Sequence, residues 1–126
     1  MSARILNGRE VAKAVREEVA ASAARFAEVH GRAPGLEVIL VGEDPGSQVY
    51  VRNKERMAGQ VGLRGAVHRL PAETPQAELH ALLARLNADD AVDGILVQLP
   101  LPVGLDPLAA TDRIDPAKDV AGLTPL

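Results

Sequence analysis

Hydrophobic and polar positions along the chain switch between two spacings. Short apolar runs alternate with longer stretches in which apolar residues recur every three or four positions. The first pattern is typical of buried β-strands, and the second is typical of helices that bury one face. Strands that alternate with helices pair in parallel through right-handed crossovers. The sequence therefore predicts an α/β domain of three layers, with a mostly parallel sheet flanked by helices.

Three apolar runs have the length and composition of buried strands. Each is too short for the core of a helix, and the first is rich in β-branched residues. They are residues 36–42 (LEVILVG), 65–70 (GAVHRL) and 95–99 (ILVQL). Pro100 and Pro102 follow the third run, and because proline cannot donate to a ladder, they should end that strand.

Four other stretches are expected to be helical. They are a first helix capped by Asn7 and stopped by Gly31, a second capped by Ser47 that runs to about Val61, a third opened by Thr74 as cap and Pro75 as first residue, and a short fourth from Asp106-Pro107 to about Ile114. One face of the first helix would carry Val11, Val15, Val19, Ser22 and Phe26, and the buried stripe of the third would be Leu79, Leu82, Leu83 and Leu86. Residues 43–46 (EDPG) are expected to form the turn before the second helix.

Length, composition and charge indicate the number of domains, the kinds of partner and the compartment of the protein. A chain of 126 residues, 47% hydrophobic and 25% charged, suits one compact domain spanning residues 1–126. The net charge is −3 and the basic residues are scattered, so we expect no nucleic-acid partner and no membrane partner. The lack of cysteine, of a signal-peptide pattern and of an apolar run of the roughly 20 residues needed to span a bilayer favours a cytoplasmic protein.

Tyr50 and Lys54 form the first candidate for a chemical function. They are four residues apart on the second helix, so they share one of its faces. Such pairs usually only pack ring against stem at the surface. Their position favours a functional role, because this helix starts at the carboxyl edge of the sheet, where ligands of open parallel sheets bind.

Gln98 is a polar side chain inside the third apolar run. A buried amide is costly unless it is hydrogen-bonded, so Gln98 needs a partner, which could be a loop backbone or Lys54. With Lys54 as that partner, Tyr50, Lys54 and Gln98 would converge on one rim of the domain. Such convergence is the usual mark of a site.

These residues lie in three stretches that resemble the N-terminal domain of the bifunctional methylenetetrahydrofolate dehydrogenase/cyclohydrolase family. The stretches are VILVGEDPGSQVYVRNK (38–54), GILVQLPLP (94–102) and DPAKDVAG (115–122), in the order and at the spacing of the family. The similarity runs through essentially the whole chain. It implies a folate-binding catalytic domain of one-carbon metabolism, with tetrahydrofolate derivatives as substrates.

The resemblance also implies roles for individual residues. Lys54 would be the catalytic amine, Tyr50 would stack on and orient the pterin, and Gln98 would hold Lys54 in place. The other substrate-binding positions would be Ser47, Leu99, Pro100 and Ala121. To accept a proton from an attacking water, the amine has to be neutral part of the time. Desolvation by aromatic and proline surfaces, or positive charge from Arg52 and Arg56, would favour that state.

Two features depart from the family pattern. The family has Lys-Asp-Val-Asp-Gly where this chain has Lys118-Asp119-Val120-Ala121-Gly122, and in the family the second aspartate hydrogen-bonds the pterin. An unmade buried contact typically costs about 1–3 kcal/mol, so folate affinity should suffer. The chain also has no Gly-rich fingerprint of a dinucleotide site. NADP would then be bound by the domain missing from this chain, and the isolated domain is expected to be inactive as a dehydrogenase.

Alternative functions follow from the same features. The main rival is a non-catalytic homologue of the folate domain that acts as a binding or dimerisation module. The complete enzyme is expected to be a homodimer that pairs through its other domain, so this piece would be monomeric. A Tyr-x-x-x-Lys pair also marks short-chain dehydrogenases, but these need an N-terminal nucleotide fingerprint. His30, His68 and His80 lie on separate elements without metal-ligand spacing, so no metal site is expected.

Overall fold

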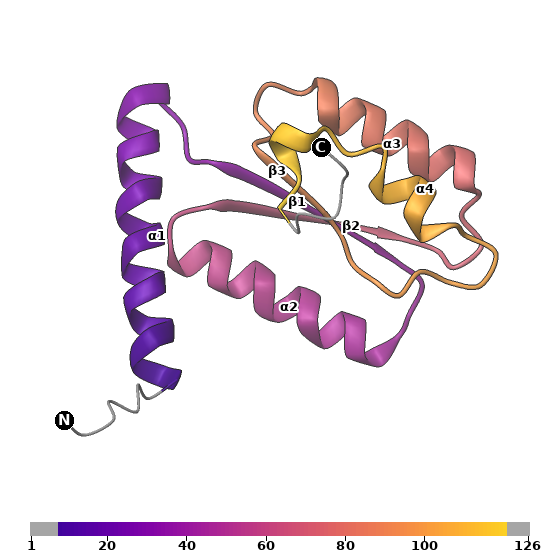
Figure 1. Cartoon of the computed structure of the whole chain (residues 1–126), viewed down its shortest axis with the longest axis horizontal. Coiled ribbons are helices and arrows are strands. Elements are labelled where there is room, and N and C mark those ends of the chain that lie inside the picture. The colour runs from indigo at the N-terminus through magenta and orange to yellow at the C-terminus, as the bar shows by residue number, and fades with distance from the viewer. Residues whose placement is uncertain (1–7, 121–126) are drawn as a thin grey trace.

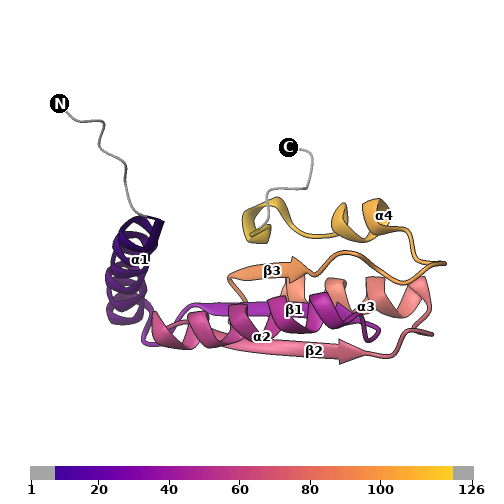
Figure 2. The same cartoon turned by 90° about the horizontal axis from the view of Figure 1, so that it is seen from below.

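The computed structural model describes residues 8–120 of the chain. The elements are α1 (Gly8–His30), β1 (Gly35–Val41), α2 (Pro45–Gln60), β2 (Arg64–Leu70), α3 (Gln76–Ala88), β3 (Gly94–Val97), α4 (Pro107–Thr111) and the 3-10 turn η1 (Pro116–Lys118). The strands form a parallel sheet in the order β2-β1-β3, and Figure 2 shows β1 between its two neighbours. The predicted α/β class with a parallel sheet is confirmed. The proposed Asn7 cap lies outside the described residues.

Helices cover both faces of the sheet. In Figure 1, α3 and α2 lie on opposite sides of the strands. The larger core lies on the α3 side and contains Ile39, Val41, Leu79, Leu82, Leu83, Leu86, Val92, Ile95, Val97, Ala110 and Ile114. The smaller core lies on the α2 side, where Val38, Leu40 and Val51 are buried. The predicted leucine stripe of the third helix is therefore part of the main core.

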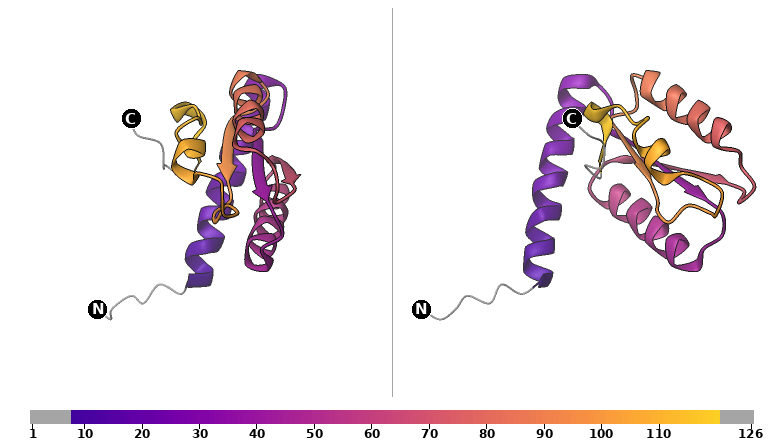
Figure 3. Two further views of the ribbon diagram at one scale, coloured as in Figure 1. Left: turned by 90° about the vertical axis from the view of Figure 1, so that its right-hand side faces the viewer. Right: turned by 45° about the vertical axis from the view of Figure 1, so that its right-hand side comes forward.

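The first helix stands to one side of the sheet. Figure 3 shows α1 set apart from the layers that the other elements form. Ala23 is 4% exposed, but Val15 and Val19 are 51% and 38% exposed although the spacing places them on the apolar face. Among the described residues, the contacts of α1 therefore cover only part of that face.

Three helical elements begin with the same dipeptide, Asp-Pro. The N-caps are Asp44 for α2, Asp106 for α4 and Asp115 for η1. Each carboxylate accepts a hydrogen bond from a backbone N–H two or three residues on, at 2.9 Å in α2 and η1 and at 3.2 Å in α4. Proline suits the first helical position because an N–H there has no intrahelical partner. A local signal thus sets the start of all three elements.

Two of the predicted helix starts are wrong. Ser47 does not cap α2, because Asp44 already supplies the acceptor and Pro45 is helical. Thr74 does not cap α3, because its hydroxyl donates instead to the carbonyl of Pro71 at 2.6 Å. For α2, a neighbouring aspartate is the cap in place of the serine. For α3, a nearby backbone carbonyl binds the hydroxyl that was expected to cap the helix.

The third strand is also shorter than predicted, because it ends at Val97 and not at Leu99. The prolines at 100 and 102 cannot donate to a ladder, so pairing with β1 stops before them. The last paired residues are Ile39 and Val97.

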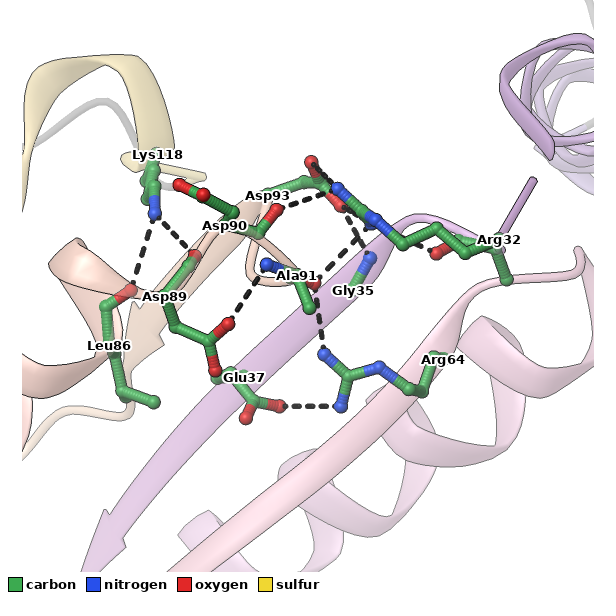
Figure 4. Close-up of polar contacts among 11 residues, drawn as sticks. Arg32, Gly35, Glu37, Arg64, Leu86, Asp89, Asp90, Ala91, Asp93 and Lys118 are labelled. Atoms are coloured by element: carbon green, nitrogen blue, oxygen red, sulfur yellow. Dashed lines mark hydrogen bonds and ion pairs between the residues drawn. The ribbon is translucent and has the colours of Figure 1, made fainter. Parts of the chain in front are cut away.

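An arginine joins the loops at the amino edge of the sheet (Figure 4). The Nη1 atom of Arg32 lies 2.7 Å from Oδ2 of Asp93, and Nη2 donates to the carbonyl of Asp90 at 2.8 Å. Asp93 also accepts a hydrogen bond from the N–H of Gly35 at 2.8 Å. The bond from Arg32 is the main cause that lowers the pKa of Asp93, and partial burial opposes it. These contacts hold the first residue of β1 beside the loop that leads into β3.

The lowered pKa of Asp93 predicts a pH-dependent stability. A carboxylate whose pKa is lower in the folded than in the unfolded protein stabilises the fold above the unfolded value of about 3.9, and this contribution is lost as the pH falls through the folded value. Asp93→Asn should therefore flatten the loss of unfolding free energy between about pH 5 and pH 2, measured by urea unfolding at a series of pH values. Asp112→Asn, at an exposed position, should keep the wild-type profile. An unchanged profile for Asp93→Asn would contradict this account.

Candidate active site

Lys54 projects from the middle of α2 to the carboxyl edge of the sheet. Its Nζ atom donates a hydrogen bond to Oε1 of Gln98 at 2.6 Å. The two residues are 44 positions apart in the sequence, so the parallel sheet is what brings them together. The sequence allowed either a loop backbone or Lys54 as the partner of Gln98, and the structure shows that Lys54 is a partner.

The amide of Gln98 is held in one orientation. Its side chain directly follows β3, and the residue is 8% exposed. Its Nε2 atom donates to the carbonyl of Leu99 at 3.0 Å. Because a carbonyl can only accept, this bond turns Oε1 toward Lys54. The oxygen of the Gln98 amide thus binds Lys54, and its nitrogen binds the loop backbone.

The partner of Lys54 is a neutral group. Within residues 8–120, none of the ion pairs involves Lys54. A carboxylate would stabilise the protonated amine, whereas an amide carbonyl accepts a hydrogen bond from either protonation state. The contact with Gln98 therefore fixes the position of the amine through a neutral partner. Arg52 and Arg56 are both exposed, and Arg56 donates to Asn53 at 3.1 Å.

Tyr50 lies one turn before Lys54 on α2, in the second turn of the helix. It is 60% exposed, so a ring face is open to a ligand. Leu99 is 37% exposed and Pro100 is also exposed, immediately after Gln98. Their predicted contacts with substrate stay predictions, as does that of Ala121, which lies outside the described residues.

Ser47 has a structural role at the start of α2. It is 1% exposed, and both its N–H and its hydroxyl donate to Oδ2 of Asp44 at 2.9 Å. The backbone N–H of Ser47 is the main cause that lowers the pKa of Asp44, its hydroxyl adds to this effect, and burial opposes it. Asp44 was not predicted as a cap, although the Asp-Pro dipeptide that predicts a helix start at Asp106 also occurs here. A contact between Ser47 and substrate stays a prediction.

Lys54 also borders an apolar groove of about 300 Å³ between α1, α2 and the sheet, together with Leu36, Leu96 and Val120. A larger hollow of about 490 Å³ lies at the ends of β1 and β2 and is lined by none of the predicted site residues. We place the candidate site at Lys54, because convergent polar groups identify a site better than volume does.

The three histidines make separate local contacts. His30 packs its ring on Phe26, His68 lies 3.4 Å from Glu37, and His80 is hydrogen-bonded to Gln76. Across the part of the chain that the structure describes, no three His, Cys, Asp or Glu side chains gather as a metal site would require. No helix in the same range has the length and apolar character to span a membrane.

The fold and the site define an α/β domain with a lysine–glutamine pair at the carboxyl edge of a parallel sheet. The chain belongs to the tetrahydrofolate dehydrogenase/cyclohydrolase family, whose catalytic-domain model matches residues 6–121. Two curated relatives are both named bifunctional protein FolD. The one from Acidiphilium cryptum is 62% identical over 125 residues, and the one from Sorangium cellulosum is 58% identical over 126 residues. The chain spans 43% and 44% of their lengths and 99% and 100% of its own.

Solved structures give the same result. The FolD enzyme of Campylobacter jejuni is 38% identical and superposes with a TM-score of 0.90 over 95% of this chain and 42% of that one. The methylenetetrahydrofolate dehydrogenase-cyclohydrolase of Trypanosoma brucei, solved with NADP cofactor and inhibitor, is 41% identical with a TM-score of 0.84. That match covers 93% of this chain and 40% of the other.

If the bond to Gln98 restrains Lys54, removing it should make the amine react faster with an acylating reagent. Gln98→Leu removes the acceptor, so Lys54 should be acylated faster by trace acetic anhydride, relative to the exposed Lys13 in the same molecule. We expect a change of roughly 2- to 5-fold, which corresponds to one hydrogen bond of about 0.5–1 kcal/mol. Peptide mass spectrometry measures the ratio. Gln48→Leu, a variant of a partly buried glutamine elsewhere on α2, should leave it unchanged.

Proposed function

We propose that this chain is the folate-binding, lysine-bearing part of a methylenetetrahydrofolate dehydrogenase/cyclohydrolase. Such an enzyme oxidises methylenetetrahydrofolate to methenyltetrahydrofolate with NADP and hydrolyses the product to formyltetrahydrofolate. The observation that carries the proposal is the 2.6 Å bond from Lys54 to Gln98, in a chain of this family. The proposal concerns the complete protein, because the chain spans less than half the length of its relatives.

The hydrolytic step assigns a defined task to Lys54. Water attacks the carbon between the two folate nitrogens of the methenyl cation, the electron pair of the C=N bond returns to nitrogen, and the amine takes the proton that the water loses. Protonation of one of the two nitrogens then breaks its bond to that carbon and leaves the formyl group on the other nitrogen. Gln98 would keep the amine aimed at that water through the hydrogen bond to its amide oxygen. The exposed ring of Tyr50 would stack on the folate, and Leu99 and Pro100 would complete the wall of the site.

Within residues 8–120, the N-terminus of the helix that follows β1 does not fit NADP. A dinucleotide site uses glycines at a helix N-terminus so that backbone N–H groups can bind phosphate. Here the N-terminus of α2 carries the carboxylate of Asp44, which already binds the N–H of Ser47. We therefore propose that NADP is held by the remainder of the protein, and that this chain contributes only the folate side of the oxidation.

Replacing Ala121 with aspartate is expected to raise the affinity for folate. Ala121→Asp restores the acceptor of the family pattern, and a buried hydrogen bond of about 1–3 kcal/mol corresponds to roughly 5- to 150-fold tighter binding. Calorimetric titration of the chain and the variant with a tetrahydrofolate analogue measures this. Ala117→Asp adds the same charge at an exposed position nearby and should bind like the wild type. Equal affinities for Ala121→Asp and the wild type would contradict the prediction, and no binding by either would make the rest of the protein an obligatory wall of the site.

The role of Lys54 predicts a loss of hydrolysis in a complete enzyme. Residues 1–126 can replace the matching part of the Sorangium cellulosum relative, which is 58% identical over that length. In this chimera, made with and without Ala121→Asp, Lys54→Met should lower the cyclohydrolase kcat by roughly 10²- to 10⁴-fold, the usual share of a general base. Lys13→Met, which removes an exposed lysine of α1, should not lower it. Full turnover in Lys54→Met would remove the amine from the mechanism and favour the non-catalytic binding module.

A further inference from the structure

Lys118 closes the C-terminal end of α3. Its ammonium group donates to three backbone carbonyls, those of Leu86, Asn87 and Asp89, at 3.3, 2.8 and 2.9 Å. Figure 4 shows the side chain pointing at this helix end from the segment of η1. The last carbonyls of a helix have no intrahelical partners, and a positive charge there is favourable. Lys118 thereby ties η1 to an element about 30 residues earlier in the chain.

The two residues after Lys118 continue alongside β3. Asp119 forms an isolated parallel bridge with Ile95, and the N–H of Val120 donates to the carbonyl of Ile95 at 3.4 Å. A Cβ atom added to Gly94 would lie 2.6 Å from Cγ2 of Val120, a distance that requires something to move. Glycine at this position therefore lets Val120 lie directly against the start of β3.

Val120 connects this anchor to Lys54. Its side chain is 55% exposed and borders the apolar groove that Lys54 also borders, together with Leu36 and Leu96. Val120 and Lys54 thus line one groove, so a displaced Val120 would widen the space around the Lys54 side chain. Lys118 comes directly before these two residues, so its bonds to the end of α3 restrain the point from which they run along β3.

We propose that Lys118 is a positioning residue of the Lys54 site and that it acts through Val120. It holds the segment 119–120 on β3, so that Val120 forms one wall of the groove beside Lys54. The proposal rests on the proposed function only in treating the surroundings of Lys54 as an active site. Its geometry can be tested on the chain without any folate.

The test combines Lys118→Met, Lys118→Arg, Val120→Ala and the double variant Lys118→Met/Val120→Ala. The first readout is the acylation of Lys54 relative to Lys13. The second is the hydrogen exchange of the Val120 backbone amide, measured by NMR in the variants that keep valine at this position. Lys118→Met should raise the exchange of the Val120 amide by about tenfold. Lys118→Met and Val120→Ala should each raise the Lys54 ratio by roughly 2- to 5-fold, and the double variant should not exceed the larger single effect. Lys118→Arg, which can still donate to the three carbonyls, should restore the ratio toward the wild type.

Arg113→Met is the matched control, because it removes an exposed cation from the same part of the chain and should change neither readout. A Lys118→Met variant that melts at a lower temperature but keeps the wild-type Lys54 ratio would show a structural role only and would overturn the proposal. Val120→Ala alters an exposed side chain and should fold even where Lys118→Met does not, so an unchanged ratio in Val120→Ala would overturn it as well. Failure of the folate titrations would leave these results intact, and the two proposals can therefore fail separately.

Discussion

The candidate site depends on the parallel pairing of β1 with β3. This pairing sets Ile39 opposite Val97, so the carboxyl ends of the two strands lie at the same edge of the sheet. The helix that carries Lys54 starts soon after β1, and Gln98 follows β3 directly. Side chains alternate between faces, and Gln98 has the parity of Leu96, which packs with the cluster on the α2 side. A slip of one residue in this register would turn the amide to the α3 side and leave Lys54 without its acceptor.

Much of this arrangement could be predicted from the sequence, because local composition determines it. The apolar runs defined three parallel strands, and the leucine spacing of α3 defined the main core. Gln98 was identifiable because a polar group within a buried run needs a partner, and the carboxyl edge of the sheet limits the candidates. Topology made Lys54 one of two candidate partners, and in the structure Gln98 contacts both Lys54 and the backbone of Leu99. The catalytic role of that lysine does not follow from topology, and it stays a proposal.

Other features could not be predicted, because they depend on competition between neighbouring groups or on contacts between irregular segments. Asp44 and Ser47 could both cap α2, and in the fold the aspartate caps it while the serine donates to the aspartate. The anchors made by Arg32 and Lys118 join segments more than 25 residues apart whose sequences have no periodicity. The exposure of Val15 and Val19 is a further case, since helical spacing shows which residues share a face but not whether anything covers that face.

The contacts made by Arg32 and Lys118 lie before the first residue of β3, and the Lys54–Gln98 pair lies after its last residue. Arg32 and Lys118 hold the loop that enters β3 from two sides, and Figure 4 shows both at this end of the sheet. β3 has only four residues and is hydrogen-bonded along β1, so its entry and Gln98 are joined by one short paired strand. The contacts of Arg32 and Lys118 thus lie at one end of this strand, and the amide that receives Lys54 follows the other end. A short strand that is anchored at its entry and paired along β1 limits how far the residue after its exit can move, and the hydrogen bond from Lys54 to Gln98 depends on that position.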